Sequence, residues 1–127
     1  MVVELCSKVA KLWVGEDGIC RVIHAPDTVV TLQDAQETMA EYLKINDGKR
    51  LPLLVDTKSM RSISREARHY YASADAAARA SAVALVVKTP VSEVLGNFYL
   101  GLSHPHLPSR LFTSEDDALE WLKDYLP

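Results

Sequence analysis

The chain has 127 residues, a length that suits one domain able to bury about two-thirds of its unfolded surface in a single core. Hydrophobic residues make up 48% and charged residues 24% of the sequence, as in ordinary soluble globular proteins. The formal net charge of −3 gives no reason to expect nucleic-acid binding.

Cysteine usage and hydropathy give no sign of a disulfide-rich protein or of a membrane-spanning one. Cys6 and Cys20 are too few and too poorly placed for a disulfide framework or a CxxC site. No basic segment followed by an apolar one opens the chain, so we expect no signal peptide. The most apolar run, residues 82–87, is far shorter than a membrane span. We therefore expect a reduced, cytoplasmic protein without membrane insertion.

The first two predicted strands, residues 9–14 and 19–25, flank the segment Gly15-Glu16-Asp17-Gly18. Glycine at both ends of that segment tolerates positive φ, which predicts a β-hairpin. The first strand of the hairpin is the one that we expect to run antiparallel to the rest of the sheet. Cys20 lies in the second strand, where we expect it to act as a small apolar residue.

A helix is predicted to begin near Thr31, because Thr31 and Asp34 have the spacing of a capping box. Apolar residues at helical spacing continue to Ile45, and Asn46-Asp47-Gly48 supplies the left-handed residue that ends a helix. The uninterrupted apolar run at residues 51–55 is typical of a parallel strand covered on both faces.

Polar side chains gather directly after this strand. Asp56 ends the strand, a polar loop follows, and either Ser62 or Ser64 is expected to cap the next helix. Ligands of α/β proteins collect at such strand-to-helix corners, because helix amides and loop side chains converge there.

The helix that follows, at residues 65–80, is rich in alanine, the best helix former. Ser73 and Asp75 are placed to divide this helix into two pieces. A second continuous apolar run predicts another strand at residues 82–87.

The last third of the chain contains one more helix-strand-helix unit. Thr89-Pro90 begins a helix with an N-cap and a first-turn proline, and its apolar face extends to Leu102. Residues 110–112 predict a short final strand, and Thr113 or Ser114 caps the last helix.

The element order ββαβαβαβα, without linker or repeat, predicts a single α/β domain over residues 1–127. We expect a mixed, mostly parallel sheet of about five strands with helices packed against it. Two consecutive strands lack polar alternation, which indicates burial on both faces. The residues that we expect to be almost fully buried are Leu53, Leu54, Val55, Leu85 and Val86.

This element order, with Leu-Pro-Leu-Leu-Val-Asp at residues 51–56 before a serine-headed helix, resembles the STAS-like domains, typified by bacterial anti-sigma factor antagonists. Residues 84–90 and 110–122 are similar to an uncharacterised bacterial group within that superfamily. The resemblance covers residues 9–126 and implies a small α/β domain that binds partner proteins, sometimes switched by serine phosphorylation at a helix N-terminus. The related lipid-transfer domains share the fold and bind apolar ligands. The family's Asp-Ser-Ser-Gly is replaced by Arg61-Ser62-Ile63-Ser64-Arg65, so the two serines match the switch by position only.

Catalytic and metal-binding patterns are weak. A hydrolase would need a corner serine to act with His69 and Asp56, but no nucleophile elbow or orienting group is evident. His104-Pro105-His106 lacks a third ligand at a recognisable spacing, which favours a surface loop over a metal site. The five glycines form no phosphate-loop or dinucleotide pattern. We therefore expect no catalytic residue, no metal and no cofactor.

Arginines surround the serines of the corner, and the chain from Thr113 onward is acidic. Arginine side chains together with helix amides can hold a carboxylate or a phosphate. Salt bridges from Arg65 and Arg68 to the acidic C-terminal helix are the structural alternative, and both interpretations stay open. The candidate ligand- or anion-binding residues are Asp56, Arg61, Ser62, Ser64 and Arg65.

Two classes of function stay open. The first is a non-catalytic regulatory module that binds a partner protein, as the resemblance implies. The second is a carrier of a small apolar or lipid-like ligand, with Phe98, Tyr99 and Leu102 lining its pocket. An apolar cavity on the order of hundreds of Å³ between helices and sheet would favour the carrier. A filled core would favour the module.

Large aromatic side chains are numerous for so small a core, and aromatic residues favour interfaces. They are Trp13, Tyr70, Tyr71, Tyr99 and Trp121. We therefore expect the chain to form a homodimer.

Overall fold

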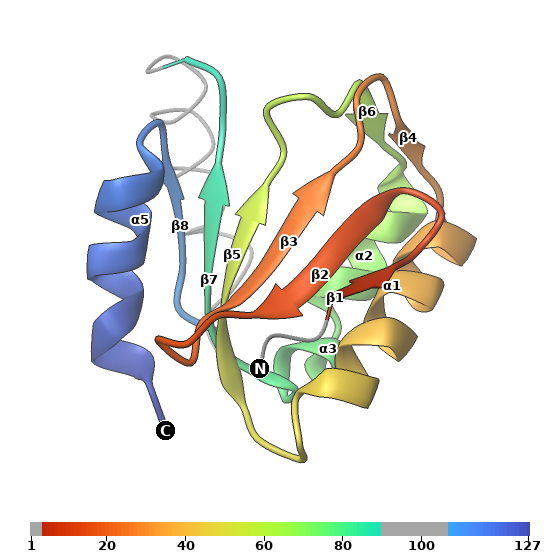
Figure 1. The fold of residues 1–127 in the computed structure, drawn as a ribbon. Helices are drawn as coiled ribbons and strands as arrows, with labels where there is room; N and C mark the ends of the chain where they lie inside the picture. The colour runs from red at the N-terminus through yellow and green to blue at the C-terminus, as the bar shows by residue number, and fades with distance from the viewer. Residues whose placement is uncertain (1–3, 90–106) are drawn as a thin grey trace.

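The structure is a computed structural model that describes residues 4–89 and 107–127 (Figure 1). Its elements, in chain order, are β1 (Glu4–Cys6), β2 (Ala10–Val14), β3 (Cys20–His24), β4 (Val29–Val30), α1 (Leu32–Ile45), β5 (Leu51–Asp56), β6 (Ser62–Ile63), α2 (Arg65–Ala72), α3 (Ala74–Ala77), β7 (Ala80–Val86), β8 (Ser109–Phe112), α5 (Glu115–Leu122) and the 3-10 helix η1 (Lys123–Tyr125). The helix predicted after Thr89-Pro90 lies outside the described residues.

The central sheet has six strands in the order β1-β2-β3-β5-β7-β8. β3, β5, β7 and β8 pair in parallel, whereas β2 pairs antiparallel with both β1 and β3. Within the described part of this sheet, β2 alone runs against the other strands, as predicted for the first arm of the hairpin. The predicted mixed, mostly parallel α/β fold is confirmed.

Three short strands are absent from the sequence-based prediction of about five strands. β1 has three residues at the edge of the sheet. β4 and β6 have two residues each and form a separate parallel pair, in which Val29 lies opposite Ser62 and Val30 opposite Ile63. Segments of two or three residues are too short to show a period of hydrophobicity, so the sequence pattern does not predict them.

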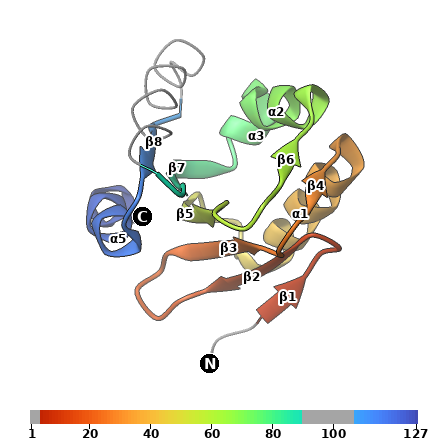
Figure 2. The ribbon, with the colours of Figure 1, turned by 90° about the horizontal axis from the view of Figure 1, so that it is seen from above.

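Helices cover both faces of the sheet. Seen from above, α5 lies on one side of β5, β7 and β8, and α1, α2 and α3 lie on the other (Figure 2). Leu54, Ala84 and Val86 pack with Ala118 and Leu122 of α5 in one core cluster. A second cluster fills the space between the sheet and α1 and α2. The described part of the molecule therefore has three layers, with the sheet in the middle.

Burial alternates along β7 and in the middle of β5, which corrects part of the prediction. Leu54 and Val86 are 0% and 1% exposed, as predicted. Leu53, Val55 and Leu85 are half-buried, so the expectation of nearly full burial is wrong for them. Side chains facing α5 are sealed by that helix, whereas α1, α2 and α3 cover the opposite face of these strands incompletely. A continuous apolar run does not reveal such a difference between the two faces.

The predicted division of the alanine-rich helix occurs at Ser73. The backbone of Ser73 is extended, with φ −64° and ψ 151°, so the helix cannot continue through it. The hydroxyl of Ser73 accepts a hydrogen bond from the amide of Ala76 at 3.2 Å and thereby caps α3. The chain turns at this point, and α3 ends shortly before β7 begins.

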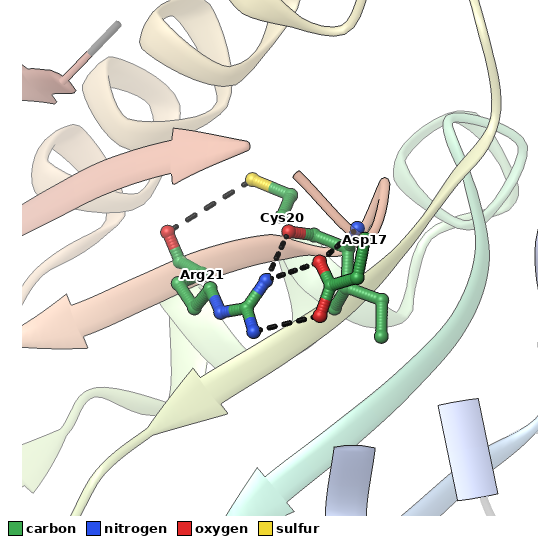
Figure 3. A network of polar contacts seen from close by, with 4 residues as sticks. Asp17, Cys20 and Arg21 are labelled. Carbon is green, nitrogen blue, oxygen red and sulfur yellow. Dashed lines mark hydrogen bonds and ion pairs between the residues drawn. The ribbon is translucent and has the colours of Figure 1, made fainter. Parts of the chain in front are cut away.

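A network of polar contacts holds the turn between β2 and β3 (Figure 3). The guanidinium of Arg21 donates to both carboxylate oxygens of Asp17, at 2.6 and 2.8 Å, and to the carbonyl of Ile19 at 2.9 Å. A methyl group on Gly15 would collide with that guanidinium, so a larger residue there would displace the Arg21 side chain from its position beside Asp17. Cys20 is fully buried beside the network, and burial raises the pKa of its thiol to about 12. Cys20 therefore acts as an apolar residue, as predicted.

The ion pair between Asp17 and Arg21 makes the stability of the fold depend on pH. The hydrogen bond from Arg21 holds the pKa of the Asp17 carboxyl below its ordinary value. Because the folded-state pKa is lower than the unfolded one, the ionised carboxylate stabilises the fold above about pH 4. This contribution is lost as the pH falls through the folded-state pKa.

We expect Asp17→Asn to lower the free energy of unfolding at pH 7 by at most about 1 kcal/mol, since the pair is partly exposed. The stability of the variant should also fall less steeply than that of the parent between about pH 5 and pH 2. Urea titrations at several pH values measure both effects. Asp124→Asn, at an exposed site with no ion pair among the described residues, is the matched control and should leave the free energy of unfolding at pH 7 unchanged. Parallel pH profiles for the parent and Asp17→Asn would refute this role of the carboxylate.

Candidate functional site

The predicted corner lies where β5 ends. The Asp56 carboxylate accepts a hydrogen bond from the amide of Lys58 at 2.9 Å, and the Lys58 ammonium lies 3.8 Å from its other oxygen. The ring Nδ1 of His24 lies 3.1 Å from the carbonyl oxygen of Asp56. Burial lowers the pKa of His24, so the neutral ring donates from Nδ1 to that carbonyl. Asp56 is therefore engaged in fixing its own loop.

At this corner two loops lie side by side and are joined by backbone hydrogen bonds. The amide of Asp27 donates to the carbonyl of Ser59 at 2.8 Å, and the amide of Arg61 donates to the carbonyl of Thr28 at 2.8 Å. The amide of Ser64 donates to the carbonyl of Val30 at 2.9 Å. These bonds continue the parallel pair of β4 and β6, and each of these strands leads directly into a helix. The N-termini of α1 and α2 consequently lie next to each other (Figures 1 and 2).

Side chains cap both helices. Thr31 forms the predicted capping box, because its hydroxyl accepts from the amide of Asp34 and the Asp34 carboxylate accepts from the amide of Thr31. The hydroxyl of Ser64 accepts from the amide of Ala67 at 3.1 Å, which makes Ser64 the N-cap of α2. Ser62 lies on β6 and is exposed. Of the two serines that the sequence left open, Ser64 is therefore the cap.

The two serines should differ in their effect on stability. We expect Ser64→Ala to lower the free energy of unfolding by about 1 kcal/mol, because the amide of Ala67 loses its acceptor. Ser62→Ala is the matched control and should change stability by less than about 0.5 kcal/mol. Chemical denaturation of the two variants beside the parent measures the difference. Equal losses for both variants would contradict the assignment of the cap.

The arginines of the corner point to solvent. Arg61 Nε lies 3.3 Å from the Asp27 carboxylate, but both side chains are largely exposed, so this ion pair contributes little. Arg65 and Arg68 are exposed and form no ion pair within the described residues. The alternative of salt bridges to the acidic C-terminal helix is wrong, because α5 lies on the opposite face of the sheet (Figure 1).

Backbone amides at the corner are less available than the sequence suggests. The amides of Arg61, Ser62 and Ser64 already donate to carbonyl oxygens of the neighbouring loop. The amides that remain available to an external ligand are those of Arg65 and Glu66 in the first turn of α2, because the first amides of a helix have no acceptor within it. The five candidate residues therefore lie on one corner, where Asp56 and Ser64 bond to their own loops and Arg61, Ser62 and Arg65 are exposed.

Exposed apolar side chains accompany these arginines, and the sequence reasoning missed them. Val29 is 47% exposed on β4, directly opposite Ser62. Leu32 is 37% exposed as the first residue of α1, the position that Arg65 occupies in α2. The sequence feature that could have indicated this apolar surface is the pair Val29-Val30, directly before the N-cap Thr31. We call the surface formed by Val29, Leu32, Arg61, Ser62 and Arg65 the corner surface.

Other predicted sites are not assembled in the described structure. No hydrogen bond there joins Asp56, His69 and either serine, and His69 is exposed on α2. No group of three metal-ligating side chains occurs among the described residues. His104 and His106 lie outside those residues, as do Phe98, Tyr99 and Leu102 of the proposed carrier pocket. None of the described helices is long and apolar enough to cross a bilayer.

An open cavity of about 360 Å³ lies at the other end of the sheet from the corner. Its lining includes Lys49, Arg50 and Arg79, so it is not the apolar cavity between helices and sheet that would favour a carrier. The described core clusters instead consist of packed apolar side chains.

A solved structure is similar in fold to this chain, and a family model matches most of its length. A family model described as a domain of unknown function, DUF7793, matches residues 12–126. An uncharacterised protein of the DUF3478 family with a SpoIIAA-like fold, from Shewanella loihica PV-4, has a TM-score of 0.58 and 16% identity, over 96% of this chain and 92% of that one. A protein of unknown function from Arthrobacter sp. FB24 is 37% identical over 87% of this chain and 96% of that one, with a TM-score of 0.36. No curated protein matches the chain. The fold is STAS-like, which confirms the resemblance found in the sequence.

Proposed function

The chain belongs to the DUF7793 family of domains of unknown function, and from this premise we propose that it is a non-catalytic regulatory module that binds a partner protein through the corner surface. The observation that carries the proposal is the combination of exposed apolar and cationic side chains on that surface. Val29 and Leu32 are exposed beside Arg61 and Arg65, over the paired N-termini of α1 and α2.

The chemistry of this surface selects the kind of partner. Two helix N-termini together place about one unit of positive partial charge at the corner. Arg61 and Arg65 add full charges, which the Asp27 carboxylate beside Arg61 and the first-turn carboxylates of Asp34 and Glu66 offset in part. An acidic segment with apolar side chains would match both properties, since interfaces combine an apolar centre with a polar, charge-complementary rim. The backbone bonds between the two loops support a preformed binding surface, which lowers the entropy lost on binding.

Affinity capture with matched variants tests the proposal. The corner variant carries Val29→Ser, Arg61→Gln and Arg65→Gln, all at exposed positions. The control variant carries Lys49→Gln, Arg50→Gln and Arg79→Gln at the other end of the sheet. A partner should be retained from cell extract by the parent and the control variant, and its affinity for the corner variant should fall about tenfold or more once purified.

Two results would refute the proposal: a purified partner that binds the corner variant as tightly as the parent, or a complex lost equally in both variants. The first result would place the interface elsewhere, and the second would mean that binding does not depend on the corner surface in particular. Thermal unfolding of both variants, recorded beforehand, shows that each is folded before its binding is compared.

We also propose that the chain associates with itself. Trp13, Tyr70, Tyr71 and Trp121 are half-buried, so each retains some aromatic surface for a second copy. We expect sedimentation equilibrium to give the mass of a dimer at about 10 µM, a concentration at which weak interfaces assemble. A monomer at that concentration would contradict self-association.

A further inference from the structure

The open cavity at the end of the sheet away from the corner surface has the charge of an anion site. It lies between the end of α1, with the turn after it, and the turn that precedes β7. Lys49, Arg50 and Arg79 line it, and no carboxylate is among its lining residues. The chain as a whole carries a net charge of −3, so three cations around one cavity of about 360 Å³ are a local excess.

These three cations are not neutralised by their surroundings. All three are exposed, and none forms an ion pair within the described residues. Asp47 and Asp75, the acidic residues nearest to them in the sequence, do not line the cavity. The C-terminal end of α1 contributes about half a negative charge, which three full positive charges outweigh.

Buried polar groups fix the backbone that carries the cations. The hydroxyl of Tyr42 donates to the carbonyl of Arg79 at 2.7 Å and accepts from the amide of Leu51 at 3.3 Å. The buried side chain of Asn46 donates to the carbonyl of Lys49 at 3.1 Å. Both walls of the cavity are therefore tied to the interior, and a ligand would not have to order them.

The guanidinium of Arg50 is also held in place. Its Nη2 donates to the carbonyl of Ala80 at 3.2 Å, which joins the residue before β5 to the first residue of β7. The remaining N–H groups of that guanidinium stay available, because arginine carries five donors. Arginine matches the geometry of phosphate and carboxylate oxygens, and lysine adds a point charge.

We propose that this cavity binds a small molecule through its phosphate groups. A single carboxylate would neutralise one of the three cations, whereas a phosphate monoester carries nearly two negative charges and a diphosphate carries more. The volume is within the usual range of small-molecule sites. This inference is independent of the proposed function, which concerns the opposite end of the sheet.

Amide chemical shifts measured during titration with pyrophosphate, at constant ionic strength, test the site. We expect saturable shifts at residues 46–50 and 78–79, with weaker binding of inorganic phosphate. In the variant with Lys49→Gln, Arg50→Gln and Arg79→Gln, the affinity for pyrophosphate should fall at least tenfold. Lys49→Gln alone, at an exposed site that leaves the Arg50 hydrogen bond intact, should lower it severalfold. The corner variant should bind pyrophosphate as the parent does.

Three results would overturn the proposal. The first is no saturable shift at these amides up to about 10 mM pyrophosphate, a concentration well above the Kd of a specific metabolite site. The others are an unchanged affinity in both cavity variants, or shifts that saturate at residues 61–66 instead. The last result would assign the anion to the corner surface. Because the corner variant and the cavity variants share no substitution, the two proposals fail independently.

Discussion

Leu54→Ala should lower the free energy of unfolding by about 2–5 kcal/mol, the largest loss among the substitutions considered. Leu54 is 0% exposed in the middle of β5 and packs between its sheet neighbours and α5. Truncation removes buried apolar surface and leaves a cavity that the surrounding strands cannot fill, because β5 is paired on both sides. Urea unfolding with an unchanged m-value would measure the loss.

Leu43→Ala provides the matched control for this substitution. It deletes the same atoms from a side chain that is 40% exposed on α1, so we expect a change below about 0.5 kcal/mol. A loss of less than about 1 kcal/mol for Leu54→Ala would contradict the packing of α5 against the centre of the sheet.

Tyr42→Phe is expected to have the second largest effect, a loss of about 1–3 kcal/mol. The Tyr42 hydroxyl joins three elements, since it bonds the amide of Leu51 at the start of β5 and the carbonyl of Arg79 before β7. Leu51 is 5% exposed, so without the hydroxyl its buried amide would lack the bond to Tyr42. An unsatisfied buried donor costs more than the net value of the bond itself.

Thermal and urea unfolding of Tyr42→Phe measure this effect. Tyr125→Phe is the control, because the Tyr125 hydroxyl makes no hydrogen bond within the described residues. Parent-like stability of Tyr42→Phe would show that Leu51 and Arg79 find other partners. It would also remove the argument that Tyr42 fixes the walls of the cationic cavity.

Local sequence patterns were sufficient to predict the long elements. The β2–β3 hairpin, the capping box at Thr31 and the break at Ser73 each depend on residues close together in the chain. The parallel sheet follows from alternation of strands and helices, for which geometry permits few connections. The STAS-like resemblance depended on the same order of elements, and it is confirmed.

Features that depend on contacts between distant segments could not be predicted. Val29 and Ser62 become neighbours through a pair of two-residue strands that has no sequence period. The half-buried state of Leu53 and Leu85 depends on how fully helices cover one face of the sheet. The cationic cavity joins Lys49 and Arg50 to Arg79 across about 30 residues of chain, a proximity that requires the fold. All five candidate residues lie at the corner, but the exposed Val29 and Leu32 were found from the structure.

The most direct test of a partner-binding corner is hydrogen–deuterium exchange of the chain in complex with its purified partner. The account predicts slower exchange at residues 27–32 and 61–68, where β4, β6 and the first turns of α1 and α2 meet. Exchange on the face of α5 should stay as in the free chain. Protection confined to α5 or to the cationic cavity, with residues 27–32 and 61–68 unchanged, would contradict the account.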